Sequence, residues 1–363
     1  MQTKNTQNAA QTGKNRWVSG LLKILGRCLL VLLETVVLLV IVLYGVMYVL
    51  AKGPSPTARD IFVMSVRETS AVGFIADIFF TPEEIAAIEA KGEEEESVDT
   101  DTSLIVMPTD GPTETGPVTD EWGLVDEDGD GIILEKVSGE GYSGYMMVVL
   151  DPSRVIMGCR PERFGVAGAT VADMAKHFGA VAGINAGGFE DLEGKGHGET
   201  PDSLVVYEGQ IHYADSGVQS GFVGLDSNHI LHVGKLQPET IQARDIQYGV
   251  SFGPVLVSNG NITQQAKWGS GVNPRTAIGQ REDGAILMLV IDGRQLTSLG
   301  ATLGDLADVM IEYGAVNACN LDGGSSTMMW YEGEYVNNCA SVIGIRPVPT
   351  TFLVLPKEAG GNG

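Results

Sequence analysis

The stretch AILMLVIDGR, residues 285–294, decides the fold of this chain. Its first seven residues are apolar, which predicts a β-strand buried on both faces, so the charged Asp292 that follows lies where the sheet meets solvent. The apolar run at residues 315–321 has the same character and is followed by DGGSS at 322–326. A third polar cluster, NPRT, stands at 273–276. We therefore expect an acid, an arginine and hydroxyl groups to converge at strand ends.

Shorter apolar runs predict further strands and few helices. Candidate strands recur within residues 132–158 and 204–258, and turn pairs separate them in the pattern of antiparallel meanders. Helices are predicted at 170–178 and 302–313, each followed by a glycine. No G-x-G-x-x-G motif opens a helix, which disfavours a dinucleotide-binding fold. The predicted class is α+β, with a mixed, mainly antiparallel sheet, a few flanking helices and one preceding transmembrane helix.

The N-terminal part of the chain predicts a membrane anchor. Residues 28–50 are apolar apart from Glu34 and Thr35, and a span needs about 20 such residues. The 27 residues before them carry five basic side chains and no acidic one. The positive-inside rule therefore places the N-terminus in the cytoplasm and the C-terminal domain outside the cell membrane, which the chain crosses once. A cleavable signal peptide is the alternative, although its apolar region usually has only about 7–15 residues.

The composition of the following segments predicts a stalk and a linker. The stretch TPEEIAAIEA at 81–90 has a capping-box signature, with Thr81 as N-cap and Glu84 three residues later. Residues 91–121 are acidic and have few apolar side chains to bury. The predicted organisation is a basic cytoplasmic tail at 1–27, the anchor at 28–50, a helical juxtamembrane stalk at 51–90, an acidic flexible linker at 91–121, the main domain at 122–357 and a tail at 358–363.

The charge is divided unevenly along the chain. The net charge is −23, and because the first 53 residues contribute +5, the rest carries −28. Such an exterior repels polyanions, so nucleic acid is excluded as a partner, since its binding depends on clustered Lys and Arg. An anionic substrate must therefore be held locally, by a few arginines.

Cysteines and acidic motifs do not predict a metal site. The four cysteines show neither CxxC nor Cys/His metal spacing. Cys319 lies in an apolar run and is more typical of a core residue than of a nucleophile. The residues leave open whether it pairs with Cys339. The segment DEDGDG at 126–131 resembles half of a calcium loop, but Val137 stands where the loop requires glutamate, so we interpret the segment as a turn.

Another polar cluster, NAGGF at 185–189, follows a predicted buried strand. Glycines in such a place allow a tight turn whose N–H groups bind an anion or a carbonyl. The loop after it carries His197 and Thr200 as candidate ligand contacts. His197 is either a proton donor or phosphate partner, or an exposed loop histidine without a role.

The clusters together resemble a known family. In order they are NAGGF, GKGHGETP, SFGP, NPRTAIG, VIDGR and NLDGGSS. This order resembles the phosphodiester glycosidase family, whose animal member uncovers mannose 6-phosphate by removing N-acetylglucosamine from a phosphodiester. Its bacterial members, including a membrane-anchored branch, are often labelled exopolysaccharide-related. The resemblance covers about residues 132–355. It departs at NAGGF, where NGGFF is expected, and at Glu199, which stands where the family tends towards glycine and is assigned no catalytic role.

The resemblance implies a hydrolase that cleaves a sugar-1-phosphodiester in a cell-wall or exopolysaccharide glycan. Such a reaction needs a carboxylate as base or nucleophile, while the phosphate leaves readily. Asp322 is the first candidate for this carboxylate and Asp292 the second. The planar fork of Arg275 suits a phosphate group. Asn185 would orient a sugar hydroxyl.

Further site predictions concern binding, and several alternatives stay open. Arg294 is either a ligand contact or a structural partner of Asp292. The pair Asp292 and Asp322 would also suit a divalent cation serving the same phosphate, and Asp322 alone also fits an ordinary Asp-Gly turn. The competing function is a non-catalytic anchored module that binds polysaccharide or cell wall. The candidate substrate-binding residues are Gly187, Gly188, His197, Thr200, Gly323, Gly324, Ser325, Ser326 and Arg294.

Overall fold

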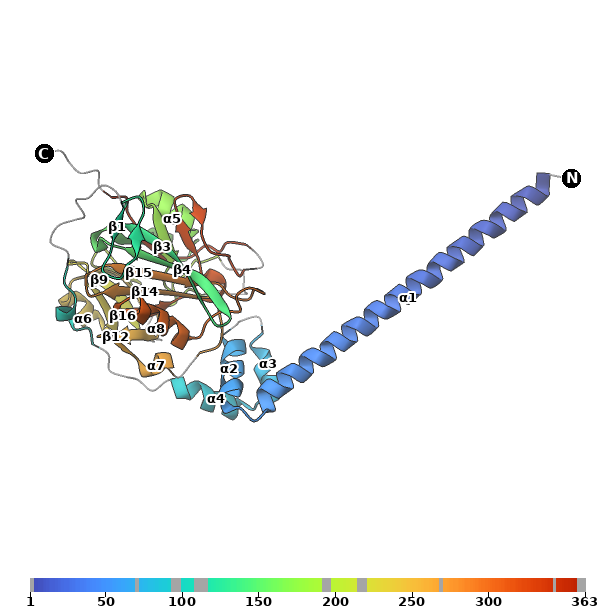
Figure 1. Cartoon of the computed structure of the whole chain (residues 1–363), viewed down its shortest axis with the longest axis horizontal. Helices are drawn as coiled ribbons and strands as arrows, with labels where there is room; N and C mark the ends of the chain where they lie inside the picture. Colours follow the sequence, from blue (N-terminus) through green and yellow to red (C-terminus); the bar gives the residue numbers. More distant parts are fainter. Residues whose placement is uncertain are drawn as a thin grey trace. The chain divides into compact units, whose positions relative to one another are not determined.

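The structure is a computed structural model that describes residues 3–68, 72–92, 99–107, 117–190, 197–213, 221–267, 270–341 and 344–357 (Figure 1). The chain divides into two compact units, Met1–Phe62 and Val63–Gly363. The first unit contains α1 (Thr3–Lys52). Its part Lys23–Lys52 is long and apolar enough to cross a membrane, and it includes the predicted span at 28–50.

The remaining helices are short. Two of them begin with a capping box. The Thr81 N–H donates to the Glu84 carboxylate at 2.9 Å, as the sequence predicted, and the Thr302 N–H donates to the Asp305 carboxylate at 2.8 Å. The helices are α2 (Pro56–Arg67), α3 (Phe74–Phe79), α4 (Pro82–Glu89), α5 (Val171–Phe178), α6 (Pro238–Ala243), α7 (Gln264–Lys267) and α8 (Leu303–Glu312). Single 3₁₀ turns occupy Ala90–Gly92, Thr102–Leu104, Pro152–Arg154, Pro161–Arg163 and Gly324–Ser326.

Part of the predicted flexible linker lies on the second unit. The Val106 N–H donates to the Glu282 carbonyl at 2.7 Å, and the Val233 N–H donates to the Thr100 hydroxyl at 2.9 Å. The Ile105 side chain is buried. Residues 99–107 are therefore fixed to the domain, which corrects the expectation of a free linker there. The tail predicted at 358–363 lies outside the described residues, as do 93–98 and 108–116 of the linker.

Four sheets form the body of the second unit, and every pairing among the described strands is antiparallel. This confirms the predicted α+β class. The first sheet pairs β1 (Val118–Thr119) with β2 (Val125–Asp126). The second has the order β10 (Leu231–Gly234), β9 (Phe222–Asp226), β11 (Ile246–Val250), β7 (Val205–Tyr207) and β8 (Gln210–Tyr213).

The two other sheets carry the predicted polar clusters. The third has the order β13 (Asn261–Ile262), β12 (Val255–Ser258), β16 (Ala315–Leu321), β14 (Arg275–Arg281), β15 (Ile286–Ile291), β4 (Tyr142–Val149) and β3 (Ile132–Gly139). The fourth has the order β18 (Glu334–Tyr335), β17 (Met329–Tyr331), β6 (Ala182–Asn185), β19 (Thr350–Val354) and β5 (Val155–Cys159).

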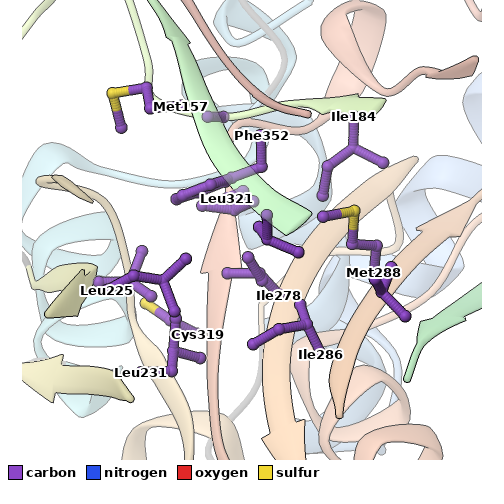
Figure 2. Close-up of a cluster of buried hydrophobic side chains, with 14 of the residues drawn as sticks. Met157, Ile184, Leu225, Leu231, Ile278, Ile286, Met288, Cys319, Leu321 and Phe352 are labelled. Atoms are coloured by element: carbon purple, nitrogen blue, oxygen red, sulfur yellow. The ribbon is translucent and has the colours of Figure 1, made fainter. Parts of the chain in front are cut away.

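Strand β15 is buried on both faces, as its composition predicted, and its six residues have 0% exposure. Ile286, Met288 and Val290 face a core shared with the second and fourth sheets. Leu287, Leu289 and Ile291 face a second core, to which α8 contributes on the other side. Figure 2 shows the first core, with Met157, Ile184 and Phe352 from the fourth sheet, Leu225 and Leu231 from the second, and Ile278, Ile286, Met288, Cys319 and Leu321 from the third.

Two further expectations concern Cys319 and the acidic turn. Cys319 is a core residue, and all four cysteines are free, so it does not pair with Cys339. The turn at 126–131 leads into β3, and its three aspartates hold oxygens within 4.8 Å of one another. The carboxylate of Asp126, however, already accepts the N–H groups of Gly129 and Gly131. These hydrogen bonds stabilise the turn that the sequence predicted.

The double-sided burial of β15 gives a stability prediction. Replacing Leu289 by alanine leaves a cavity in the second core, so the free energy of unfolding should fall by about 2–5 kcal/mol. Leu296→Ala removes the same atoms from a side chain that is fully exposed, and the change there should stay within about 0.5 kcal/mol. Denaturant unfolding of both variants measures the difference. Equal losses would contradict the assignment of β15 to the core.

Candidate active site

The register of β14 brings three of the predicted residues to one edge of the third sheet. Thr276 of β14 pairs with Val290 of β15 on one side and with Leu321 of β16 on the other. Asp292 comes two residues after Val290, Asp322 directly follows Leu321, and Arg275 comes one residue before Thr276. The three polar clusters therefore meet at this edge, as the ends of the apolar runs predicted.

Asp322 lies half-buried at the start of the loop that leaves β16. Burial raises the pKa of its carboxyl to about 7, and the charge of Asp202 adds to the rise. The Ser326 hydroxyl, which hydrogen-bonds to the carboxylate, and the charge of Arg346 oppose it. The result is a carboxyl that exchanges its proton near neutral pH, which is what acid–base chemistry needs.

Asp202 is a site residue that the sequence did not predict. Its N–H donates to the Gly188 carbonyl at 3.2 Å. Gly188 approaches it so closely that a Cβ there would lie 2.3 Å from Asp202 Oδ2, so a larger residue would displace the carboxylate. Asp202 is accessible to solvent, yet the loops around it shield its carboxyl enough to raise the pKa. The available signal was its place two residues after the predicted loop contact Thr200.

The side chain of Asn185 holds the backbone of Asp322 in place. It has 0% exposure, and its amide nitrogen donates to the Asp322 carbonyl at 2.6 Å. Its amide oxygen accepts the Thr276 hydroxyl at 2.9 Å and the Met328 N–H at 3.0 Å. The Asp322 N–H in turn donates to the Ala186 carbonyl at 2.9 Å. Asn185 therefore positions the Asp322 loop, and its burial does not fit the predicted contact with a sugar hydroxyl.

Three other candidate residues use backbone groups in hydrogen bonds within the domain. The Gly187 N–H donates to the Thr350 hydroxyl at 3.0 Å, so it is not presented to a ligand as predicted. His197 is exposed, and its carbonyl accepts the Gly168 N–H. Thr200 is half-buried, and its carbonyl accepts the Glu190 N–H at 2.9 Å.

Arg275 is buried, and its guanidinium already binds a carboxylate. Its Nη2 donates to Glu68 Oε2 at 2.7 Å, to the Ser270 hydroxyl at 2.7 Å and to the Gly271 carbonyl at 2.7 Å. Asn273 Nδ2 donates to the same Glu68 oxygen at 2.8 Å. The Arg275 guanidinium therefore holds an anion in this structure, the Glu68 carboxylate.

Arg294 stands between this anion position and the Asp322 loop. Its φ of 58° is in the left-handed region, which is uncommon for residues other than glycine and aims the side chain at that loop. Its Nη1 donates to the Ser325 hydroxyl at 3.4 Å and its Nη2 donates to the Asn273 side-chain oxygen at 3.2 Å. A Cβ on Gly324 would lie 3.4 Å from the guanidinium. Gly323 packs equally closely on the Pro274 carbonyl, at 2.8 Å from a Cβ there.

Asp292 has partners of its own on this edge. Its carboxylate accepts the Asn338 N–H at 2.9 Å and the Asn337 side-chain nitrogen at 3.2 Å. Burial raises the pKa of Asp292, and Lys136 is the charge that opposes the rise. The charges that act on Arg294 are instead those of Arg275 and Glu68. The carboxyl group coupled to Asp322 is therefore Asp202 and not Asp292, which also weakens the case for a cation held by Asp292 and Asp322.

The same sheet edge thus carries two features. Asp322 is a carboxyl of raised pKa whose charged neighbours are Asp202 and Arg346. Arg275 and Arg294 form a separate cluster of guanidinium groups around Glu68. Residues 178–355 match the model of the family described as phosphodiester glycosidase. This part of the chain therefore matches the phosphodiester glycosidase family, as the order of its motifs predicted.

Three relatives illustrate the match. The chain is 30% identical over 201 residues to the SPbeta prophage-derived uncharacterized protein YomE of Bacillus subtilis, covering 52% of this chain and 30% of that protein. It is 27% identical over 220 residues to the N-acetylglucosamine-1-phosphodiester alpha-N-acetylglucosaminidase of Mus musculus, covering 54% of this chain and 41% of that enzyme. It is also 27% identical over 194 residues to the enzyme of the same name from Bos taurus, covering 48% of this chain and 35% of that enzyme. The chain thus spans less than half the length of these relatives.

A solved structure shares the fold. The zebrafish N-acetylglucosamine-1-phosphodiester alpha-N-acetylglucosaminidase catalytic domain, auto-inhibited by its pro-peptide, superposes with a TM-score of 0.53 and 19% sequence identity. The superposition covers 70% of this chain and 87% of that one.

The surroundings of Asp322 predict opposite effects of two substitutions on its pKa. Ser326→Ala removes a hydrogen bond to the ionised form and should raise the pKa above 7. Asp202→Asn removes a neighbouring negative charge and should lower it. Carbon-13 NMR titration of the aspartate carboxyls in the full chain measures both shifts. Each variant is the other's control, and shifts of the same sign would contradict the proposed arrangement.

Proposed function

We propose that this chain is a hydrolase that cleaves sugar-1-phosphodiesters at the anomeric carbon. The observation that carries the proposal is the half-buried Asp322, whose carboxyl has a pKa of about 7 and stands on one loop with Ser325, the hydrogen-bond partner of Arg294. The family supports a hydrolase of this type. In this proposal Asp322 acts on the sugar, and a separate group of donors binds the phosphate.

In the proposed reaction, ionised Asp322 acts as base or nucleophile at the anomeric carbon. Asp202 keeps its pKa high, and the Ser326 hydrogen bond stabilises the carboxylate. The phosphate leaves with its electron pair and needs little protonation, so donors that hold its oxygens matter more than a second acid. Arg294, beside Ser325 at the far end of the same loop, is placed to provide such donors.

We further infer a membrane-anchored, extracytoplasmic enzyme. The support is the apolar helix Lys23–Lys52 and the basic residues before it. The N-terminus then lies in the cytoplasm and the domain faces the glycans outside the membrane. This location favours a bacterial cell-wall or exopolysaccharide phosphodiester as substrate.

The first test is turnover by the full chain in detergent micelles. Wild-type protein should release free N-acetylglucosamine from N-acetylglucosamine-1-phosphodiesters, and Asp322→Asn should lower kcat/KM by about 10³-fold or more because the base or nucleophile is lost. Asp308→Asn, an exposed change on α8, is the matched control and should keep full activity. Coupled detection of the released sugar measures the rates.

Binding without turnover across a panel of wall-derived diesters, with and without divalent cations, would contradict the enzyme. It would favour the competing function, a non-catalytic module that binds polysaccharide. Equal activity of Asp322→Asn and wild type would leave hydrolysis in place and remove Asp322 from the mechanism.

The raised pKa gives a second test. A base or nucleophile must be ionised, so kcat/KM should fall about tenfold per pH unit as the pH drops below about 7 and level off above it. An acid would give the opposite dependence, with activity lost as the pH rises. The pH profile of wild type distinguishes the two roles, and the Ser326→Ala midpoint should move to higher pH. A flat profile down to pH 5 would contradict both.

A further inference from the structure

The Glu68 carboxylate is held by donors from one short loop of the domain. Glu68 Oε1 accepts the Gly271 N–H at 3.1 Å. Its Oε2 accepts Asn273 Nδ2 at 2.8 Å and Arg275 Nη2 at 2.7 Å. A backbone N–H, a side-chain amide and a guanidinium converge on one anion, with both of its oxygens bound.

This loop has the properties of a built anion site. The Arg275 side chain is only 9% exposed, and it is fixed by the Ser270 hydroxyl and the Gly271 carbonyl in addition to Glu68. Arg294 adds a second guanidinium, since its charge acts on the same Glu68 and Arg275. Two neighbouring guanidinium groups repel each other unless an anion lies between them, so this position requires a negative charge.

The anion now in the site comes from the chain that precedes the domain. Glu68 directly follows α2, and Ser65 on α2 accepts the Val272 N–H at 2.9 Å. The backbones approach so closely that a Cβ on Gly271 would lie 2.1 Å from Ser65 Cα. Glu68 is therefore presented to the loop by a docked helix end, and its own side chain is still 27% exposed.

We propose that Gly271, Asn273, Arg275 and Arg294 form the phosphate subsite, and that Glu68 is an internal occupant that the substrate phosphate displaces. A phosphate oxygen pair accepts the same N–H donors as the two carboxylate oxygens. The proposal rests on the proposed function, because it assigns this subsite to the phosphate of the diester. The docked segment then regulates the site: phosphate binds weakly while Glu68 is seated and tightly when it withdraws.

The size of the effect follows from the population of the seated state. If Glu68 occupies the subsite more than nine-tenths of the time, the apparent Kd for phosphate is raised at least about tenfold. Inorganic phosphate is a suitable probe, since it needs no sugar contact and no turnover. Glu68→Gln keeps the shape of the side chain and removes its charge, and Glu68→Ala removes the group altogether.

The experiment is calorimetric titration of inorganic phosphate into the full chain in detergent micelles. Both Glu68 variants should bind phosphate about tenfold or more tightly than wild type, and adding Arg275→Lys to Glu68→Gln should weaken binding again. Glu89→Gln is the matched control: it breaks the 3.3 Å contact of Arg67 with α4 without touching the subsite, and its Kd should equal that of wild type. Thermal unfolding of each variant verifies that it is folded.

Two results would overturn the inference. One is equal phosphate affinity in wild type and both folded Glu68 variants, which means that Glu68 only fastens the helix. The other is no phosphate binding in any variant. Diester hydrolysis is measured separately. Tighter phosphate binding by the Glu68 variants without turnover would reject the proposed hydrolase and keep the phosphate subsite. Turnover with unchanged phosphate affinity would keep the hydrolase and reject Glu68 as an occupant of the subsite.

Discussion

The candidate site depends on the register of β14 between β15 and β16. Because both faces of β15 are buried, a slip by one residue would exchange the side chains that face the two cores. The apolar packing therefore permits one pairing, in which Thr276 lies opposite Val290 and Leu321. Hydrophobic burial thus determines which strand ends meet, and polar contacts then position the groups there, such as the hydrogen bond from Asn185 to the Asp322 carbonyl.

The same burial explains the unusual electrostatics at this edge. A carboxyl that directly follows a fully buried strand loses part of its hydration, so Asp322 keeps its proton to about pH 7. A guanidinium in that position keeps its charge and must find an anion, and Arg275 finds Glu68. On a chain whose exterior is strongly acidic, this edge concentrates positive charge locally, where a phosphate group can be held against the general repulsion.

Much of the fold and half of the site could be predicted from local patterns. Apolar runs and the polar residues that end them lie close together in the sequence, so the buried strands and the position of Arg275 and Asp322 at one sheet edge follow from composition. Asp202 and Glu68 were missed because their positions depend on how a loop and a helix end pack on the sheet. The role of Asn185 was misjudged for the same reason, since pairing of β6 with β17 and β19 buries its amide.

The loop at residues 322–326 joins the two halves of the site. Asp322 stands at its start and hydrogen-bonds to Ser326, and the neighbouring Ser325 hydroxyl accepts from Arg294. The charges that act on Asp322 are those of Asp202 and Arg346, whereas those that act on Arg294 are Arg275 and Glu68. The loop therefore separates the carboxyl proposed for the chemistry from the guanidinium groups proposed to hold the phosphate. Exchange of Glu68 for a phosphodiester, which also carries one negative charge, would leave the net charge of that guanidinium cluster unchanged.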